Sequence, residues 1–123
     1  MVYHIVDIMR ERYTFGVDFK NTNDTLVQYS DIDWIGSGTK PTEAQVNAWV
    51  AEKNDVLVLA ELRKLRNKKL SETDWTRNDD VPSETKTKWA SYRQGLRDLP
   101  ADASKRSINA NGDVTITWPT EPS

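Results

Sequence analysis

The stretch "LSETDWTRNDDVPSETKTKWASYRQGLRDLP", residues 70–100, decides the fold that this sequence predicts. In its second half, aromatic and leucine side chains recur every three or four residues from Trp89 to Leu99. That spacing places them on one face of an α-helix. Ser83 is a predicted N-cap, because its hydroxyl can accept from a free amide of the first turn. The stretch therefore predicts a helix over residues 84–99.

The segment before it predicts a partner for this helix. Residues 55–75 place Leu62 and Leu65 on one face and charged side chains on the other. A loop over residues 76–83 is short enough to make the two helices an antiparallel hairpin. An earlier helical pattern over residues 42–54, with Thr39 or Thr42 as its cap, either forms a separate helix or joins the next one with only a kink at Asn54 and Asp55.

The first third of the chain predicts strands. Residues 13–19 alternate aromatic and apolar side chains with polar ones, the period of a half-buried strand. Residues 2–9 are rich in β-branched and apolar side chains, and residues 25–35 are read as a third strand. Residues 20–24 have turn chemistry. The segment is therefore predicted to be a small antiparallel meander.

The expected fold class is α+β. It comprises an N-terminal β-strand segment over residues 1–38, a helical region with the hairpin over 39–100, and an extended tail over 101–123. Within the tail, the alternation of Val114, Ile116 and Trp118 predicts a short strand or an extended arm.

Charge and composition exclude several classes of protein. The chain of 123 residues has a net charge of -2 and no cysteine, so disulfides, thiolate zinc sites and thiol catalysis are ruled out. The basic run "RKLRNKK", residues 63–69, is read as a solvated helix face rather than a nucleic-acid site, because a basic stripe normally dominates its domain's charge. No apolar run approaches the ~20 residues that span a bilayer, and no secretory signal is present. Neither nucleic acid nor a membrane is an expected partner.

Residues for catalysis are sparse. His4 is the chain's one histidine, so a nucleophilic triad has no base, and it is read as a structural or surface group. Asp79 and Asp80 lack the further oxygen ligands that a hard cation needs. We therefore expect no enzyme, no cofactor and no metal. A glycosidase-type carboxylate pair stays as a remaining alternative, since any two acidic residues could meet in the fold.

Aromatic and arginine side chains stand out instead, because five tryptophans are many for so polar a chain. Tryptophan, tyrosine and arginine concentrate binding energy at interfaces. The expected partner-binding residues are Trp75, Trp89, Tyr92, Arg93, Arg97 and Trp118. The expected structural ion-pairing residues are Arg63, Arg66, Asp74 and Asp98. Two readings of Arg93 and Arg97 stay open, because a guanidinium can either brace the hairpin through a carboxylate or reach a partner.

These residues also carry a family resemblance. An arginine-rich helix ends in "LSETDW", a loop carries an aspartate, a second helix contains "WASYRQGLRDLP", and "WP" follows near the end of the chain. Over about residues 60–119 this pattern resembles the phage tail assembly chaperone family. The matching positions are Arg63, Arg66, Leu70, Thr73, Asp74, Trp75, Asp80, Trp89, Tyr92, Arg93, Leu96, Arg97, Asp98, Leu99, Pro100, Trp118 and Pro119.

The resemblance implies a protein that binds the trimeric C-terminal tip of a phage tail fibre protein and aids its folding and trimerisation. It implies work in the host cytoplasm during assembly, and a place on the virion tail fibre if the protein is retained as a cap. The alternative is a permanent virion component at the fibre tip that contacts the host receptor. Purified particles would separate a chaperone that leaves from a protein that stays.

Overall fold

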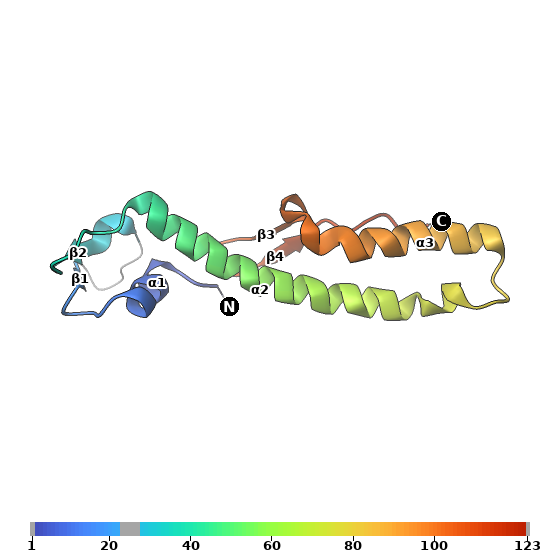
Figure 1. The fold of residues 1–123 in the computed structure, drawn as a ribbon, viewed down its shortest axis with the longest axis horizontal. Helices are drawn as coiled ribbons and strands as arrows, with labels where there is room; N and C mark the ends of the chain where they lie inside the picture. Colours follow the sequence, from blue (N-terminus) through green and yellow to red (C-terminus); the bar gives the residue numbers. More distant parts are fainter. Residues whose placement is uncertain (1, 23–27, 123) are drawn as a thin grey trace. The chain divides into compact units, whose positions relative to one another are not determined.

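A computed structural model describes residues 2–22 and 28–122 of the chain, and it has an α+β fold. In these described residues, three α-helices are accompanied by two small two-stranded antiparallel sheets (Figure 1). The chain divides into two compact units, Met1–Val56 and Leu57–Ser123, with the division inside the longest helix. In chain order the elements are α1 (Ile5–Arg12), β1 (Phe19–Asn21), η1 (Tyr29–Asp31), β2 (Ile32–Trp34), α2 (Glu43–Glu72), η2 (Asp74–Arg77), α3 (Ser83–Asp98), η3 (Leu99–Ala101), η4 (Ala103–Lys105), β3 (Arg106–Ile108) and β4 (Val114–Ile116).

The first predicted strand is wrong, because residues 5–12 form the helix α1. Its first turn is closed by Asp7, whose carboxylate accepts from the amide of His4 at 2.8 Å. Ile8 and Met9 are buried, which leaves the charged side chains of the helix on its other face. The β-branched composition favoured a strand, but the helical spacing of the apolar side chains decides the structure here.

The remaining strand predictions for this segment are only partly correct. β1 and β2 pair antiparallel with Phe19 opposite Trp34, so a two-stranded ribbon replaces the predicted three-stranded meander. Phe15 and Val17 lie outside the strand and are exposed, because the chain turns there through Gly16, whose φ is 85°. The predicted turn and third strand fall partly on residues 23–27, which lie outside the described residues.

The core of the first unit joins elements that are distant in the sequence. Met9, Phe19, Ile32 and Val46 form one buried cluster. They come from α1, β1, β2 and α2 respectively. Burial of these side chains stabilises the unit and explains why such short strands persist, since a two-stranded ribbon is marginal alone.

Of the two alternatives for the helical patterns before the loop, the joined one is correct, because they form one continuous helix, α2. Thr42 begins it as predicted for a capping threonine: its hydroxyl accepts from the Gln45 amide at 3.2 Å, and the Gln45 side chain accepts from the Thr42 amide at 2.9 Å. Asn54 does not end the helix. Its side chain is buried and is bonded to the backbone of Tyr3, accepting at 2.6 Å and donating at 3.0 Å. The tertiary contact thus satisfies the side chain that would otherwise compete with the helix.

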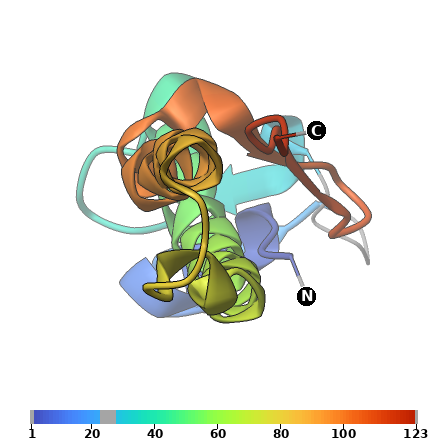
Figure 2. The ribbon, with the colours of Figure 1, turned by 90° about the vertical axis from the view of Figure 1, so that its right-hand side faces the viewer.

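In the second unit, α3 lies alongside the C-terminal part of α2 (Figures 1 and 2). α3 covers nearly the predicted range, but Ser83 is its first residue and Pro82 occupies the N-cap position. Val58 and Leu62 from α2 are buried, as are Leu96 from α3 and Leu99 just after it. α2 ends at Glu72 rather than at the predicted residue 75, and the 3-10 turn η2 covers the end of the predicted helix and the first two residues of the predicted loop.

The tail is more ordered than predicted, because β3 pairs antiparallel with β4. The strand Val114–Ile116 is confirmed, whereas its partner Arg106–Ile108 was not predicted. Asn109 organises the turn between them: its side-chain oxygen accepts from the amides of Asn111 and Asp113, both at 2.9 Å. Gly112 completes the turn with a φ of 89°, a backbone conformation that residues other than glycine rarely adopt.

A glycine in the middle of α3 allows the tail to pack closely. A Cβ atom at Gly95 would lie 3.3 Å from both Cβ and Cγ of Pro119. Glycine costs a helix interior about 1 kcal/mol relative to alanine, so its presence here indicates that close approach of the tail matters more than helix propensity.

We predict that Gly95→Ala stabilises the chain less than helix propensity alone would, because the new methyl group presses on Pro119. In a Pro119→Gly background the same substitution is expected to recover about 1 kcal/mol. Urea unfolding of the four chains of this double-mutant cycle measures the coupling. Additive effects would show that the proline ring does not limit the site.

Candidate functional site

Arg93 joins the two helices of the second unit. Its guanidinium donates to the Leu70 carbonyl and to the Thr73 hydroxyl, both at 2.7 Å, and to an Asp74 carboxylate oxygen at 3.0 Å. The arginine is only 7% exposed, whereas the Asp74 side chain is 69% exposed. The bond to Leu70 satisfies one of the last carbonyls of α2, where a cation also complements the helix dipole.

Thr73, between α2 and Asp74, connects the Arg93 guanidinium to the last turn of α2. Its hydroxyl accepts from Arg93 and donates to the Lys69 carbonyl at 3.0 Å. Its own carbonyl accepts from the hydroxyl of Thr76, a fully buried side chain, at 2.7 Å. The end of α2 is therefore closed by a connected set of hydrogen bonds whose members orient one another.

Three aromatic rings contact one another edge to face beside this network. Trp75 from η2 lies 5.7 Å from Trp89, and Trp89 lies 5.6 Å from Tyr92, both edge to face. Exposure falls along the series, because Trp75 is 50% exposed, Trp89 is half-buried and Tyr92 is 4% exposed. We call Trp75, Trp89 and Tyr92 the aromatic cluster. Its outer ring faces solvent while its inner ring is held in the core.

Trp118 lies against α2. The Lys69 ammonium is 4.8 Å from the centre of its ring, a cation–π contact. Together with Leu65, Lys68 and Glu72, these two residues line a groove of about 250 Å³, which we call the Trp118 groove. Sequence reasoning singled out Trp118 but missed the groove, because only the fold of the tail brings the ring to the helix.

The other predicted site residues are more exposed. Arg97 lies on the surface of α3, and Asp98 accepts from Gln94 on the same helix at 2.9 Å. Arg66 donates to its neighbour Asn67, at 3.1 and 3.2 Å. Arg63 is exposed on α2. Among the residues that the structure describes, Asp74 is the one member of the expected ion-pairing set that pairs, and its partner is Arg93.

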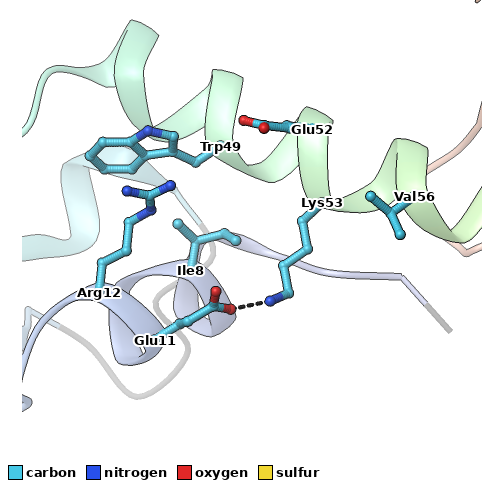
Figure 3. A pocket seen from close by; sticks show the side chains of 7 residues that line it. All are labelled: Ile8, Glu11, Arg12, Trp49, Glu52, Lys53 and Val56. Atoms are coloured by element: carbon cyan, nitrogen blue, oxygen red, sulfur yellow. Dashed lines mark hydrogen bonds and ion pairs between the residues drawn. The ribbon is translucent and has the colours of Figure 1, made fainter.

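A second pocket, of about 200 Å³, lies in the first unit between α1 and α2 (Figure 3). The Arg12 guanidinium stacks over Trp49, with 4.0 Å between its central carbon and the ring centre. Lys53 forms an ion pair with Glu11, and this hydrogen bond raises the pKa of Lys53 above its usual value. In this pocket one lysine is therefore neutralised by a neighbouring carboxylate, and Arg12 covers one face of the Trp49 ring.

The ionisation of Tyr92 reflects its place in the core. Burial raises the pKa of its phenol above the ordinary value, and the charge of Glu121 and a hydrogen bond to that carboxylate, 3.5 Å long, act in the same direction. The neutral phenol is therefore the form that the fold favours.

The residues that were weighed for catalysis or metal binding lie at exposed positions in the part of the chain that the structure describes. No group of three or more histidine, cysteine or carboxylate side chains there is placed to hold a metal ion. His4 is exposed at the start of α1, and Asp79 and Asp80 are exposed in the loop. None of the helices in this part of the chain is long and apolar enough to cross a membrane.

Comparison with known proteins identifies the second unit. A family model described as "Phage tail assembly chaperone protein" matches residues 59–123, more than half of the chain. The resemblance that the sequence motifs indicated is confirmed by this match. No curated protein and no solved structure gives a significant match.

We predict that Arg93→Lys lowers the free energy of unfolding by about 2–3 kcal/mol, because one ammonium cannot serve the three acceptors that the guanidinium fork reaches. Arg97→Lys is the matched control, since it makes the same change one turn later at an exposed position. We expect it to alter stability by less than about 0.5 kcal/mol. Equal losses in urea unfolding would mean that the network does not depend on the fork.

We predict that stability falls at alkaline pH through Tyr92. A raised pKa in the fold means that the stabilising contribution is fully present below the usual tyrosine value of 10.0 and is lost as pH rises through the folded value. Tyr92→Phe should flatten this decline, and Glu121→Gln should make it smaller, because the pKa of Tyr92 in the folded chain is then raised less above 10.0 and the decline ends at a lower pH. Urea titrations followed by tryptophan fluorescence across the alkaline range test this. An identical decline in the phenylalanine variant would assign it to other groups.

Proposed function

Because the chain belongs to the phage tail assembly chaperone family, we propose that it binds the C-terminal tip of a tail fibre protein and aids its folding and trimerisation. Membership alone implies tail proteins as partners, in a family that is typically non-enzymatic. The fibre, its tip and the act of trimerisation are the proposal.

The observation that carries the proposal is the aromatic cluster on its braced hairpin. Trp75 leaves half of its surface in solvent, although a tryptophan is costly to expose and is among the side chains that dominate interfaces. Trp89 and Tyr92 support it from α3. A ring held in place before binding loses little conformational freedom when a partner covers it.

The contacts of the two arginines divide their roles. Arg93 is occupied by the end of α2, so its part in binding is to hold the hairpin on which Trp75 stands. Arg97 is exposed on the same helix and is available for a carboxylate of the partner. Trp118 would add contact area at the separate groove beside α2.

This arrangement suits the physical problem of fibre assembly. A β-rich trimeric tip exposes strand ends and forms long-range pairings slowly, so its intermediates tend to aggregate. A protein that covers such a surface stabilises the folded partner by binding alone and needs no active site. A chaperone that never leaves would become a cap on the virion, where it could contact the host receptor.

We predict that co-expression with the C-terminal segment of the tail fibre protein increases the yield of soluble trimer. Trp75→Ala should weaken binding by about 2 kcal/mol, as expected for an exposed aromatic anchor, while leaving the helical content unchanged. Phe15→Ala is the matched control, because Phe15 is also 50% exposed but lies in the first unit. Size-exclusion chromatography of the co-expressed proteins gives both yield and co-elution.

Each outcome has a distinct meaning. More trimer with the chain co-eluting supports a retained cap, and more trimer without it supports a chaperone that departs. No change in yield together with no co-elution would reject the fibre-tip proposal. Equal losses of binding in the Trp75 and Phe15 variants would reject the aromatic cluster as the contact surface.

A further inference from the structure

The Trp118 groove combines an apolar wall with ammonium groups. Leu65 and the ring of Trp118 supply the apolar surface, and Lys68 and Lys69 supply positive charge beside it. One carboxylate, that of Glu72, is also part of the lining. A ligand that fits must therefore carry both negative charge and an apolar group.

The positive charge of the groove continues along α2. Five cationic side chains occur within residues 63–69, and no carboxylate pairs with any of them in the described part of the chain. Arg63, Lys64 and Lys68 are exposed. A run of cations without intramolecular ion pairs attracts an oppositely charged partner and raises its rate of association.

The groove is formed before any ligand arrives. The wall is anchored by the tail, because Pro119 packs against Gly95 of α3 and the Thr117 amide donates to the Lys105 carbonyl at 2.8 Å. Lys69 is already oriented by its contact with the Trp118 ring. Preorganisation of this kind lowers the entropic cost of binding.

We propose that the Trp118 groove binds an acidic polypeptide segment, with carboxylates pairing to Lys68 and Lys69 and an apolar side chain packed between Leu65 and Trp118. The identification of that segment as part of the assisted tail protein rests on the proposed function. The volume of about 250 Å³ holds only one or two side chains, so the remaining acidic residues would extend along the exposed cations of α2.

Charge distribution favours a polypeptide over nucleic acid. The unit Leu57–Ser123 carries twelve Lys/Arg against ten Asp/Glu, a net of only +2, and Glu72 lies in the groove itself. A nucleic-acid backbone places a negative charge at every step and is held by a correspondingly dense set of cations. A peptide with spaced carboxylates can place an apolar or neutral group opposite Glu72.

A fluorescein-labelled peptide of glutamate, leucine and glycine is the probe, with fluorescence anisotropy as the readout. The same peptide with glutamine in place of glutamate, and a single-stranded oligonucleotide of equal charge, are the comparison ligands. We expect salt-sensitive binding of the acidic peptide, and clearly weaker binding of the other two.

Three variants locate the binding. Lys68→Glu should lower the affinity for the acidic peptide at least about fivefold, because an exposed ion pair is replaced by repulsion. Glu72→Gln should raise the affinity for the acidic peptide about twofold, because it removes a repulsive charge from the groove. Lys88→Glu is the matched control on α3: it makes the same change of charge outside the groove, at a side chain paired only with Glu84 at 3.6 Å, and should leave the affinity unchanged.

Several results would overturn the proposal. They are equal weakening by Lys68→Glu and Lys88→Glu, equal binding of the glutamine peptide, or tighter binding of the oligonucleotide. Sedimentation of the chain alone tests a second copy as the occupant, since the unit Met1–Val56 has a net charge of -4. If the chain self-associates and Lys68→Glu abolishes this, the occupant of the groove is a second copy of the chain and not an acidic segment of another protein.

The two proposals fail separately. Peptide binding at the groove without any effect on fibre trimer would reject the fibre-tip function and retain the acidic-segment site. Fibre binding that requires Trp75 but is unchanged by Lys68→Glu would retain the function and reject the groove as its contact.

Discussion

The second unit depends on one buried guanidinium. Arg93 reaches from α3 to the end of α2, where a carbonyl, a hydroxyl and a carboxylate all accept from it. The contact satisfies backbone groups that a helix end leaves free, and it fixes the position of one helix against the other. Because the charge is almost fully enclosed, the loss of any of these acceptors would leave a costly unpaired donor. The hairpin is thus held by a directional polar contact as well as by its apolar face.

The surfaces for binding follow from this constraint. η2 comes directly after the end of α2, so closing that end sets the place of Trp75 against Trp89. The tail then packs across the hairpin because Gly95 leaves room for Pro119, and this places Trp118 beside α2. The aromatic cluster and the Trp118 groove share no residue, and the first is aromatic whereas the second is partly cationic. Binding through two such surfaces gives selectivity without any catalytic group.

Sequence patterns were most informative where one period dominates. The stripe from Trp89 to Leu99 predicted α3 to within a residue at each end, and the cap at Thr42 marked the start of α2. The prediction was wrong where it used residue composition instead of spacing, because Ile5, Val6 and Ile8, which favoured a strand, belong to α1. Asn54 suggested a helix boundary, yet its bonds to Tyr3 keep it inside α2. β3 was missed because Ile108 is the one apolar residue among its three, so the segment shows no alternation.

By itself the sequence determined the helical character of residues 84–99, the motif that relates the chain to its family, and the set of tryptophans and arginines that dominates its chemistry. Those features depend on local spacing and residue type, which are properties of the sequence and do not depend on contacts between distant segments. Only the tertiary structure decided that Arg93 is enclosed while Arg97 is exposed, although both are arginines one turn apart on α3. It also decided that Trp75 joins Trp89 and that Trp118 meets Lys69. Those outcomes depend on which side chains from distant segments compete for the same space and the same hydrogen-bond acceptors, and spacing along one segment does not contain that information.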